Sequence, residues 1–332
     1  FGVPDSLLPK ASLFLHAIAF GMPAVTMYSA LRNYSEALGF PRPVTALSLG
    51  ALVALIPLNF IFMYGLGPIP HLGSAGCGFA TAILQWLMLI ILAIYVFKAK
   101  RYQKTQPLTH WEKMNPVLIK RILKLGLPIG LAIFFEVSIF STGAIVLSTL
   151  GEVTIAAHQI AISVTSQLFM IPMSLALALT IRVGTYYGEK NWVAMRKVQR
   201  LGLLTATGFA FITMLLMWLL RADIVAVYTS NSEVTQIAIY LIIFAIAYQL
   251  MDAWQVSAAG CLRGMQDTKG PMWITMLAYW IIAFPVGIYL ARYTEMGAAG
   301  VWIGLIVGLS IACVLLLTRL RMNNQRLIQS SN

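Results

Sequence analysis

The chain has 332 residues, of which 59% are hydrophobic and 10% are charged. Soluble globular proteins carry about 25% charged residues, so this composition and a mean hydropathy of +0.82 exclude an ordinary soluble domain. The formal net charge of +12 is compatible with nucleic-acid binding, but the placement of the basic residues, given below, argues against a nucleic-acid partner.

Nine apolar runs follow one another along the chain, and each is near the roughly 20 residues that a helix needs to cross a bilayer. A transmembrane β-barrel would instead show alternating segments of about ten residues. We therefore expect an all-α polytopic membrane protein. The predicted spans are residues 11–31, 44–66, 74–97, 125–147, 154–181, 202–222, 234–257, 271–291 and 298–318.

The basic residues lie in alternate polar breaks between these spans. If the breaks are assigned in turn to two sides, one side holds 20 of the 23 Lys and Arg residues, and the other holds only Lys10, Arg221 and Arg292. The positive-inside rule places the richer side in the cytoplasm. The segments predicted to be cytoplasmic are 32–43, 98–124, 182–200, 258–270 and the C-terminus.

Two stretches of the chain resemble each other, residues 37–83 and residues 262–306. Gly and Pro recur in any membrane helix, but four matches with a single change of loop length favour a duplication. The matched pairs are Pro43 with Pro271, Pro57 with Pro285, Gly73 with Gly297, and Gly76 with Gly300.

Six spans separate the first copy's helix from its counterpart. Because six is an even number, both copies cross the membrane in the same direction, as the halves of many transporters do. We therefore expect a six-helix repeat unit and a twelve-helix parent whose first three helices are missing here. The expected organisation is the last three helices of an N-terminal lobe (1–98), a cytoplasmic linker (99–120), a complete six-helix C-terminal lobe (121–320) and a cytoplasmic tail (321–332).

Glu136 and Asp252 are the only acids well inside the predicted spans. A carboxylate at membrane depth is costly and is by default a functional-site hypothesis, although each acid alternatively is a hydrogen-bonded packing residue. Helical spacing places Tyr248 and Gln255 on the face of Asp252, and Ala132 and Gly143 form a small-residue face near Glu136. No Lys or Arg lies mid-span beside either acid.

The span 154–181 adds Gln159, Ser163 and Ser166 on one face as cation- or substrate-lining candidates, although small polar residues commonly join membrane helices. Oxygen donors without a counter-ion suit a hard monovalent cation or exchangeable protons. We predict one shared Na⁺ or H⁺ site at Glu136 and Asp252, with no other metal or cofactor.

Pro57, Pro128, Pro172 and Pro285 interrupt the helical hydrogen bonding of their spans. Such breaks serve bending and gating in transporters, or are simply tolerated kinks. The sixteen Met residues and the many aromatic residues fit a pliable cavity for bulky ligands, and equally fit lipid-facing packing. Three Cys and four His residues are scattered without ligand spacing, so neither a disulfide framework nor a metal-dependent enzyme is indicated.

Several strings in the chain are similar to those of the multidrug and toxic compound extrusion (MATE) family, and closest to its bacterial NorM-like branch. They are KLGLPIGLAIFFEVSIFS, AAHQIAIS, LFMIPMSLALALTIRVG, CLRGMQDTKGPM, IPLNFIFMYG and LGSAGCGFAT, and the resemblance covers essentially the whole chain. The resemblance implies twelve helices in two lobes, in a monomer of the bacterial inner membrane surrounded by lipid.

The same resemblance implies export of amphipathic, often cationic, drugs and dyes in exchange for Na⁺ or H⁺. Acids in the seventh and tenth helices couple the cation in this branch, and they correspond to Glu136 and Asp252. Phe169 stands where some sodium-coupled relatives carry a tyrosine of the cation site, which favours proton coupling. Cation binding and drug binding in the cavity between the lobes are expected to favour opposite arrangements.

Three other interpretations compete with drug export. A lipid-linked or polysaccharide flippase would need a basic cavity for anionic head groups, and the sequence places no basic residue mid-span. An integral membrane enzyme would need clustered catalytic or metal-binding residues, which the scattered His and Cys do not supply. A purely structural membrane protein leaves the paired acids unexplained.

Overall fold

The computed structural model describes residues 8–65, 71–103, 115–148 and 151–329, and throughout these ranges the regular secondary structure is helical. The helices are α1 (Leu8–Ala37), α2 (Pro41–Tyr64), α3 (Ser74–Lys98), η1 (Lys100–Tyr102), α4 (Pro116–Ser148), α5 (Glu152–Gly188), α6 (Trp192–Tyr228), α7 (Ser232–Gly264), α8 (Lys269–Thr275), η2 (Met276–Ala283), α9 (Phe284–Tyr293) and α10 (Ala298–Gln329). Within the described ranges, nine helical segments are long and apolar enough to cross a membrane, with α8, η2 and α9 forming one of them. The predicted all-α membrane class is confirmed.

The helices extend beyond the predicted apolar runs. The predicted break 182–200 shrinks to residues 189–191, because α5 continues to Gly188 and Asn191 caps the start of α6 by accepting a hydrogen bond from the Ala194 N–H at 3.1 Å. Hydropathy marks the edge of the hydrocarbon, whereas helical hydrogen bonds persist into the polar interface. Residues 116–124, 258–264 and 321–329 are likewise helical rather than loop or tail. Residues 104–114 of the predicted linker and 330–332 of the predicted tail lie outside the described residues.

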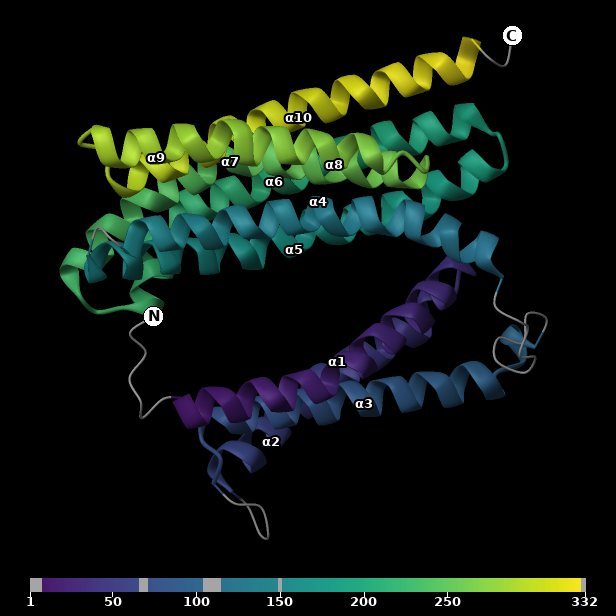
Figure 1. Ribbon diagram of the computed structural model, residues 1–332, viewed down its shortest axis with the longest axis horizontal. Helices are drawn as coiled ribbons and strands as arrows, with labels where there is room; N and C mark the ends of the chain where they lie inside the picture. Colours follow the sequence, from purple (N-terminus) through teal and green to yellow (C-terminus); the bar gives the residue numbers. More distant parts are fainter. Residues whose placement is uncertain (1–7, 66–70, 104–114, 149–150, 330–332) are drawn as a thin grey trace. The chain divides into compact units, whose positions relative to one another are not determined.

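The chain divides into two compact units, Phe1–Lys113 and Met114–Asn332. In the first unit, α3 packs against both α1 and α2. In the second, α7 is the central helix and packs against α5, α6 and α10, while α4 packs against α5 and α8 (Figure 1). The second unit contains every residue predicted for the cation site.

Two glycines bring α7 into direct backbone contact with α5. A Cβ atom on Gly260 would lie 2.5 Å from the Ala176 carbonyl oxygen, and one on Gly264 would lie 2.7 Å from that of Thr180. The Thr180 hydroxyl donates to the Gly260 carbonyl at 3.0 Å. Small residues spaced four apart allow this approach between membrane helices, and the contact holds the α7 face that carries Asp252 against α5.

The two similar stretches of sequence have similar local geometry. Gly76, at the start of α3, approaches the backbone of Phe62 and Met63, and Gly300, at the start of α10, approaches Leu290 and Ala291. Those partners are separated by 228 positions, as are the first residues of α2 and α8. The shared close approaches support the predicted duplication.

The second copy departs from the first in the middle of its Pro-containing helix. In the first copy Pro57 lies inside the continuous helix α2. In the second, the π-helix η2 precedes α9, and the Phe284 N–H donates to the Tyr279 carbonyl five residues back. Pro285 has no N–H to donate and its ring crowds the preceding turn, so the wider π turn relieves this crowding. The span predicted at 271–291 is therefore present but divided.

Candidate functional site

Helices α4, α5 and α7 enclose a cavity of about 400 Å³ in the second unit. Its polar lining comes from all three helices: Glu136 and Ser141 of α4, Thr165 and Ser166 of α5, and Tyr248, Asp252, Gln255 and Arg263 of α7. The remaining wall is apolar and consists of Ile133, Val137, Phe140, Ile162, Phe169, Met170, Met173, Val256 and Ala259.

The two predicted acids line this same cavity from different helices. Asp252 is buried, with 5% of its surface exposed, and Glu136 is half-buried. Their carboxyl groups are near enough to interact electrostatically. Because α4 and α7 both pack against α5, two acids that are 116 residues apart in the sequence line one cavity.

One face of α7 supplies the polar side of the cavity. Tyr248, Asp252 and Gln255 follow the spacing of one to two helical turns, and all three are buried. The Gln255 Oε1 and Arg263 Nε atoms are buried without a hydrogen-bond partner among the described residues. An unsatisfied buried polar group costs about 1–3 kcal/mol. A ligand that forms hydrogen bonds with these two atoms would recover that cost.

Arg263 corrects the expectation of a site without positive charge. The sequence placed this residue in a cytoplasmic break, but α7 continues to Gly264, and Arg263 lies eleven residues, about three turns, beyond Asp252 on the same face. It interacts electrostatically with Glu136, although among the described residues no ion pair joins Arg263 to either acid. Two carboxylates and one guanidinium give the cavity a formal charge of −1 when all three are ionised.

The α5 face agrees only in part with the prediction. Ser166 and Phe169 line the cavity, as does Thr165, which the sequence analysis did not select. Gln159 and Ser163 are not among its lining residues, and the Ser163 hydroxyl donates to the Gln159 carbonyl at 2.8 Å. The cavity-facing positions on α5 are 162, 165, 166, 169, 170 and 173, so Gln159 lies about one turn before the first of them and Ser163 lies beside their face.

Trp302 of α10 packs against Tyr248, one of the residues that line the cavity. Its ring centroid lies 5.9 Å from that of Tyr248, and its indole N–H donates to His158 Nδ1 at 3.2 Å. Both Trp302 and His158 are buried. His158 therefore holds the Trp302 ring, which in turn fixes the wall that carries Tyr248.

The four prolines lie in helices but not in the cavity lining. Pro57, Pro128 and Pro172 are inside α2, α4 and α5, and Pro285 follows η2 at the start of α9. Pro172 is adjacent to the lining residue Met173, and Pro128 lies about two turns before Glu136. Their predicted part in gating stays a prediction.

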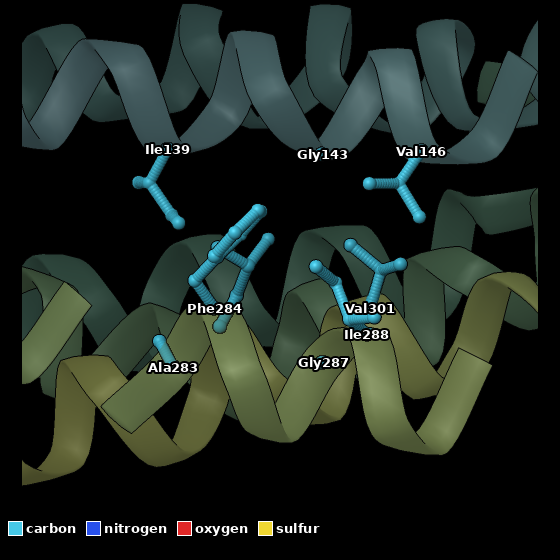
Figure 2. A pocket seen from close by; sticks show the side chains of 9 residues that line it. Ile139, Gly143, Val146, Ala283, Phe284, Gly287, Ile288 and Val301 are labelled. Atoms are coloured by element: carbon cyan, nitrogen blue, oxygen red, sulfur yellow. The ribbon is translucent and has the colours of Figure 1, made fainter. Parts of the chain in front are cut away.

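A second, much smaller pocket of about 20 Å³ lies between α4 and the α9–α10 pair. Figure 2 shows Ile139 and Val146 of α4 facing Phe284, Ile288 and Val301, with Gly143 leaving a gap in the α4 wall. A Cβ atom on Gly143 would lie 3.4 Å from the Val301 Cγ1 atom. This pocket is a small apolar packing defect beside the predicted small-residue face.

Known proteins resemble this chain over nearly its whole length. The MatE family model matches residues 128–289. The probable multidrug resistance protein NorM of Acinetobacter baylyi is 75% identical over 330 residues, which are 99% of this chain and 74% of that protein. The multidrug resistance protein NorM of Photobacterium profundum is 40% identical over 324 residues, which are 96% of this chain and 71% of that protein.

Solved structures share the fold at lower identity. The eukaryotic MATE transporter AtDTX14 matches with a TM-score of 0.87 and 20% identity, covering 98% of this chain and 74% of its own. An outward-facing multidrug resistance MATE family transporter matches with a TM-score of 0.86 and 18% identity, covering 99% of this chain and 72% of its own. From the two relatives above, the chain belongs to the multidrug and toxic compound extrusion (MATE) family of transporters and, as expected, is not an enzyme.

Proposed function

We propose that this chain carries the cation- and drug-binding cavity of a multidrug efflux transporter, which exports amphipathic, often cationic, drugs in exchange for Na⁺ or H⁺. The names of the two similar NorM proteins support drug export. The observation that carries the proposal is the shared cavity of Glu136 and Asp252, because intramembrane acids that face a cavity mark ion and substrate pathways.

The cavity's charge fits one monovalent cation at a time. With Glu136, Asp252 and Arg263 ionised, the formal charge is −1, and one proton, one Na⁺ ion or one cationic drug neutralises it. The oxygen atoms of Tyr248, Gln255 and Ser166 provide further ligands around the acids. Oxygen donors of this kind suit hard cations.

The cavity's size and apolar lining support a drug as the alternative occupant. Ligand pockets for drug-sized molecules span about 300–1,000 Å³, and this one measures about 400 Å³. Phe140 and Phe169 line the cavity with aromatic rings, which attract cations, and Met170 and Met173 adapt their shape to different ligands. A pliable apolar wall and one net negative charge together select amphipathic cations.

Exchange follows when cation and drug compete for this charge. Each ligand shifts the protein toward the conformation that it binds better, so alternate binding of the two couples cation entry to drug exit by alternating access. The protein acts as a monomer in the bacterial inner membrane, surrounded by lipid. The basic segments of the chain face the cytoplasm. They are residues 32–43, 98–124, 182–200 and 258–270 and the C-terminus.

Arg263 is the observation that favours the second candidate, a lipid-linked or polysaccharide flippase, because a basic side chain in the cavity attracts an anionic head group. The two acids outnumber this single cation, so the cavity repels phosphate-bearing cargo when all three are ionised. Drug export therefore fits the charge better. Transport of an anionic lipid-linked sugar by the purified protein would favour the flippase instead.

The test is drug resistance in cells producing the intact transporter. Glu136→Gln and Asp252→Asn should each abolish resistance and leave expression unchanged, whereas Glu152→Gln, at an exposed position in the first turn of α5, should retain it. Efflux driven by a sodium gradient, and then by a pH gradient alone, separates the two coupling ions. Wild-type resistance in either cavity variant would contradict the proposal.

A further inference from the structure

Another pocket in the same unit is basic, and its lining residues differ from those of the acid-lined cavity. It has a volume of about 390 Å³ and is bounded by the first turns of α4, the segment that joins α7 to α8, and the last third of α10. Arg121, Lys124, Lys269 and Arg319 line it together with a single acid, Asp267. Its formal charge is therefore +3.

Asp267 organises the pocket by holding Arg319 in place. Its carboxylate accepts hydrogen bonds from Arg319 Nε at 2.6 Å and Nη2 at 2.9 Å, and from Asn323 Nδ2 at 2.8 Å. Burial alone would raise the pKa of Asp267, but the hydrogen bonds from Arg319 and Asn323 outweigh burial and hold the pKa below its ordinary value. Asp267 is thus ionised at neutral pH and compensates one cation.

The Arg319 side chain packs closely against Gly270 at the start of α8. A Cβ atom at Gly270 would lie only 1.9 Å from Arg319 Nε. The guanidinium therefore lies directly against the start of α8, where any larger residue would displace it. This contact joins α10 to α8 beside the remaining basic side chains.

The other three cations are left without an anionic partner. Arg121, Lys124 and Lys269 are exposed, and among the described residues no ion pair involves any of them. Arg121 and Lys124 lie three residues apart, on neighbouring positions of one helix face. Three cations converging on one pocket favour a ligand with a phosphate group, since phosphate oxygens accept charge-assisted hydrogen bonds from Arg and Lys.

The surface beside the pocket is apolar, as a lipid ligand requires. Leu118, Ile122, Leu123 and Leu127 of α4 are 55%, 68%, 61% and 64% exposed, in the same turns as Arg121 and Lys124. A lipid acyl chain would cover this surface while its phosphate entered the pocket. A free phosphate ion would leave the apolar surface uncovered.

We propose that this pocket binds the phosphate of an anionic phospholipid head group, with Arg121 and Lys124 from α4 and Lys269 from α8 as its principal contacts. Basic pockets between membrane helices at the membrane surface bind anionic lipid head groups. The bound lipid links the start of α4, the helix of Glu136, to the start of α8. The inference needs only a membrane-embedded chain and does not depend on drug export.

Binding is measured on the intact transporter purified in an uncharged detergent. Dioleoyl phosphatidylglycerol, dioleoyl phosphatidylcholine and inorganic phosphate are titrated separately, and the dissociation constant is obtained from the shift of the thermal unfolding midpoint. The wild-type protein should bind phosphatidylglycerol at least tenfold more tightly than phosphatidylcholine or inorganic phosphate. Equal affinity for phosphatidylcholine, or equally tight binding of inorganic phosphate, would overturn the proposal.

The variants test whether lipid binding depends on this pocket or on basic surface charge in general. Removing two surface cations by Arg121→Gln with Lys124→Gln should weaken phosphatidylglycerol binding roughly thirtyfold, and Lys269→Gln alone should weaken it roughly fivefold. The control, Lys197→Gln with Arg200→Gln, removes two exposed charges with the same spacing from α6, and should change affinity by less than about threefold. An equal loss in the α6 control, or unchanged affinity in both pocket variants, would contradict the proposal.

Discussion

The contact between α5 and α7 yields a sharp prediction for Gly260→Ala. The added methyl carbon would lie 2.5 Å from the Ala176 carbonyl oxygen and 3.0 Å from its Cα atom, whereas carbon atoms in ordinary contact are separated by about 3.5–4.0 Å. Both nearest atoms belong to the backbone, so no side-chain rotation relieves the overlap. The helices must separate by roughly 1 Å, which also strains the hydrogen bond from Thr180 to the Gly260 carbonyl.

Overpacking of this kind costs about 1–3 kcal/mol, and the gain in helix propensity from Gly to Ala recovers at most about 1 kcal/mol. We therefore expect Gly260→Ala to lower the thermal unfolding midpoint and to weaken drug binding, because α7 carries Asp252 and Gln255 against α5. Unfolding exposes the buried thiols of Cys261 and Cys313, and a thiol-reactive dye reports it as labelling beyond that of the half-buried Cys77. The matched control is Gly208→Ala on α6, where nothing lies within 4 Å of the added carbon. If Gly260→Ala were as stable as this control, the proposed backbone contact would be wrong.

Three further predictions concern charged and aromatic groups. Arg263→Gln changes the cavity's formal charge from −1 to −2. A monovalent cationic drug should therefore bind the purified variant roughly tenfold more tightly than wild type and dissociate more slowly. Weaker drug binding in this titration would contradict the assigned charge. Phe169→Tyr places a hydroxyl in the cavity lining. At the same pH gradient, a sodium gradient should stimulate drug efflux more in this variant than in wild type. An equal sodium response in the two proteins would mean that Phe169 is not part of the cation site. Asp267→Asn tests pH dependence. Because the folded-state pKa of Asp267 lies below its ordinary value of 3.8, its contribution to stability is present above that pH and is lost as pH falls through the folded pKa. The variant should therefore be less stable than wild type at neutral pH, and the difference should shrink as pH falls below 3.8; an equal deficit at every pH would mean that the loss is not electrostatic.

The sequence was sufficient to predict the membrane class and the approximate position of each span, because hydropathy reports directly on the hydrocarbon core. It also selected Glu136 and Asp252, since acids inside apolar runs are rare. Helix ends were predicted poorly, because helical hydrogen bonding continues where hydropathy falls. Arg263 was overlooked for this reason, although its spacing of eleven residues from Asp252 is compatible with one helix face.

Other features depend on packing that one sequence does not reveal. Thr165 lines the cavity and Ser163 does not, a difference of two positions on α5 that only the orientation of the helix decides. The pairing of Asp267 with Arg319 joins residues 52 positions apart. Pro285 marked an interruption of its span, but whether the chain responds with a kink or with a π turn depends on the helices packed around it.

Charge displacement on drug binding tests the proposed exchange most directly. A monovalent cationic drug is titrated calorimetrically into the purified intact transporter, in buffers of different ionisation enthalpy and at several sodium concentrations, so that released protons and competing Na⁺ are counted. The proposed mechanism requires one proton or one Na⁺ ion to leave for each drug molecule bound, and none in Glu136→Gln or Asp252→Asn. Drug binding that releases no cation, and is insensitive to pH, to sodium and to both substitutions, would contradict it.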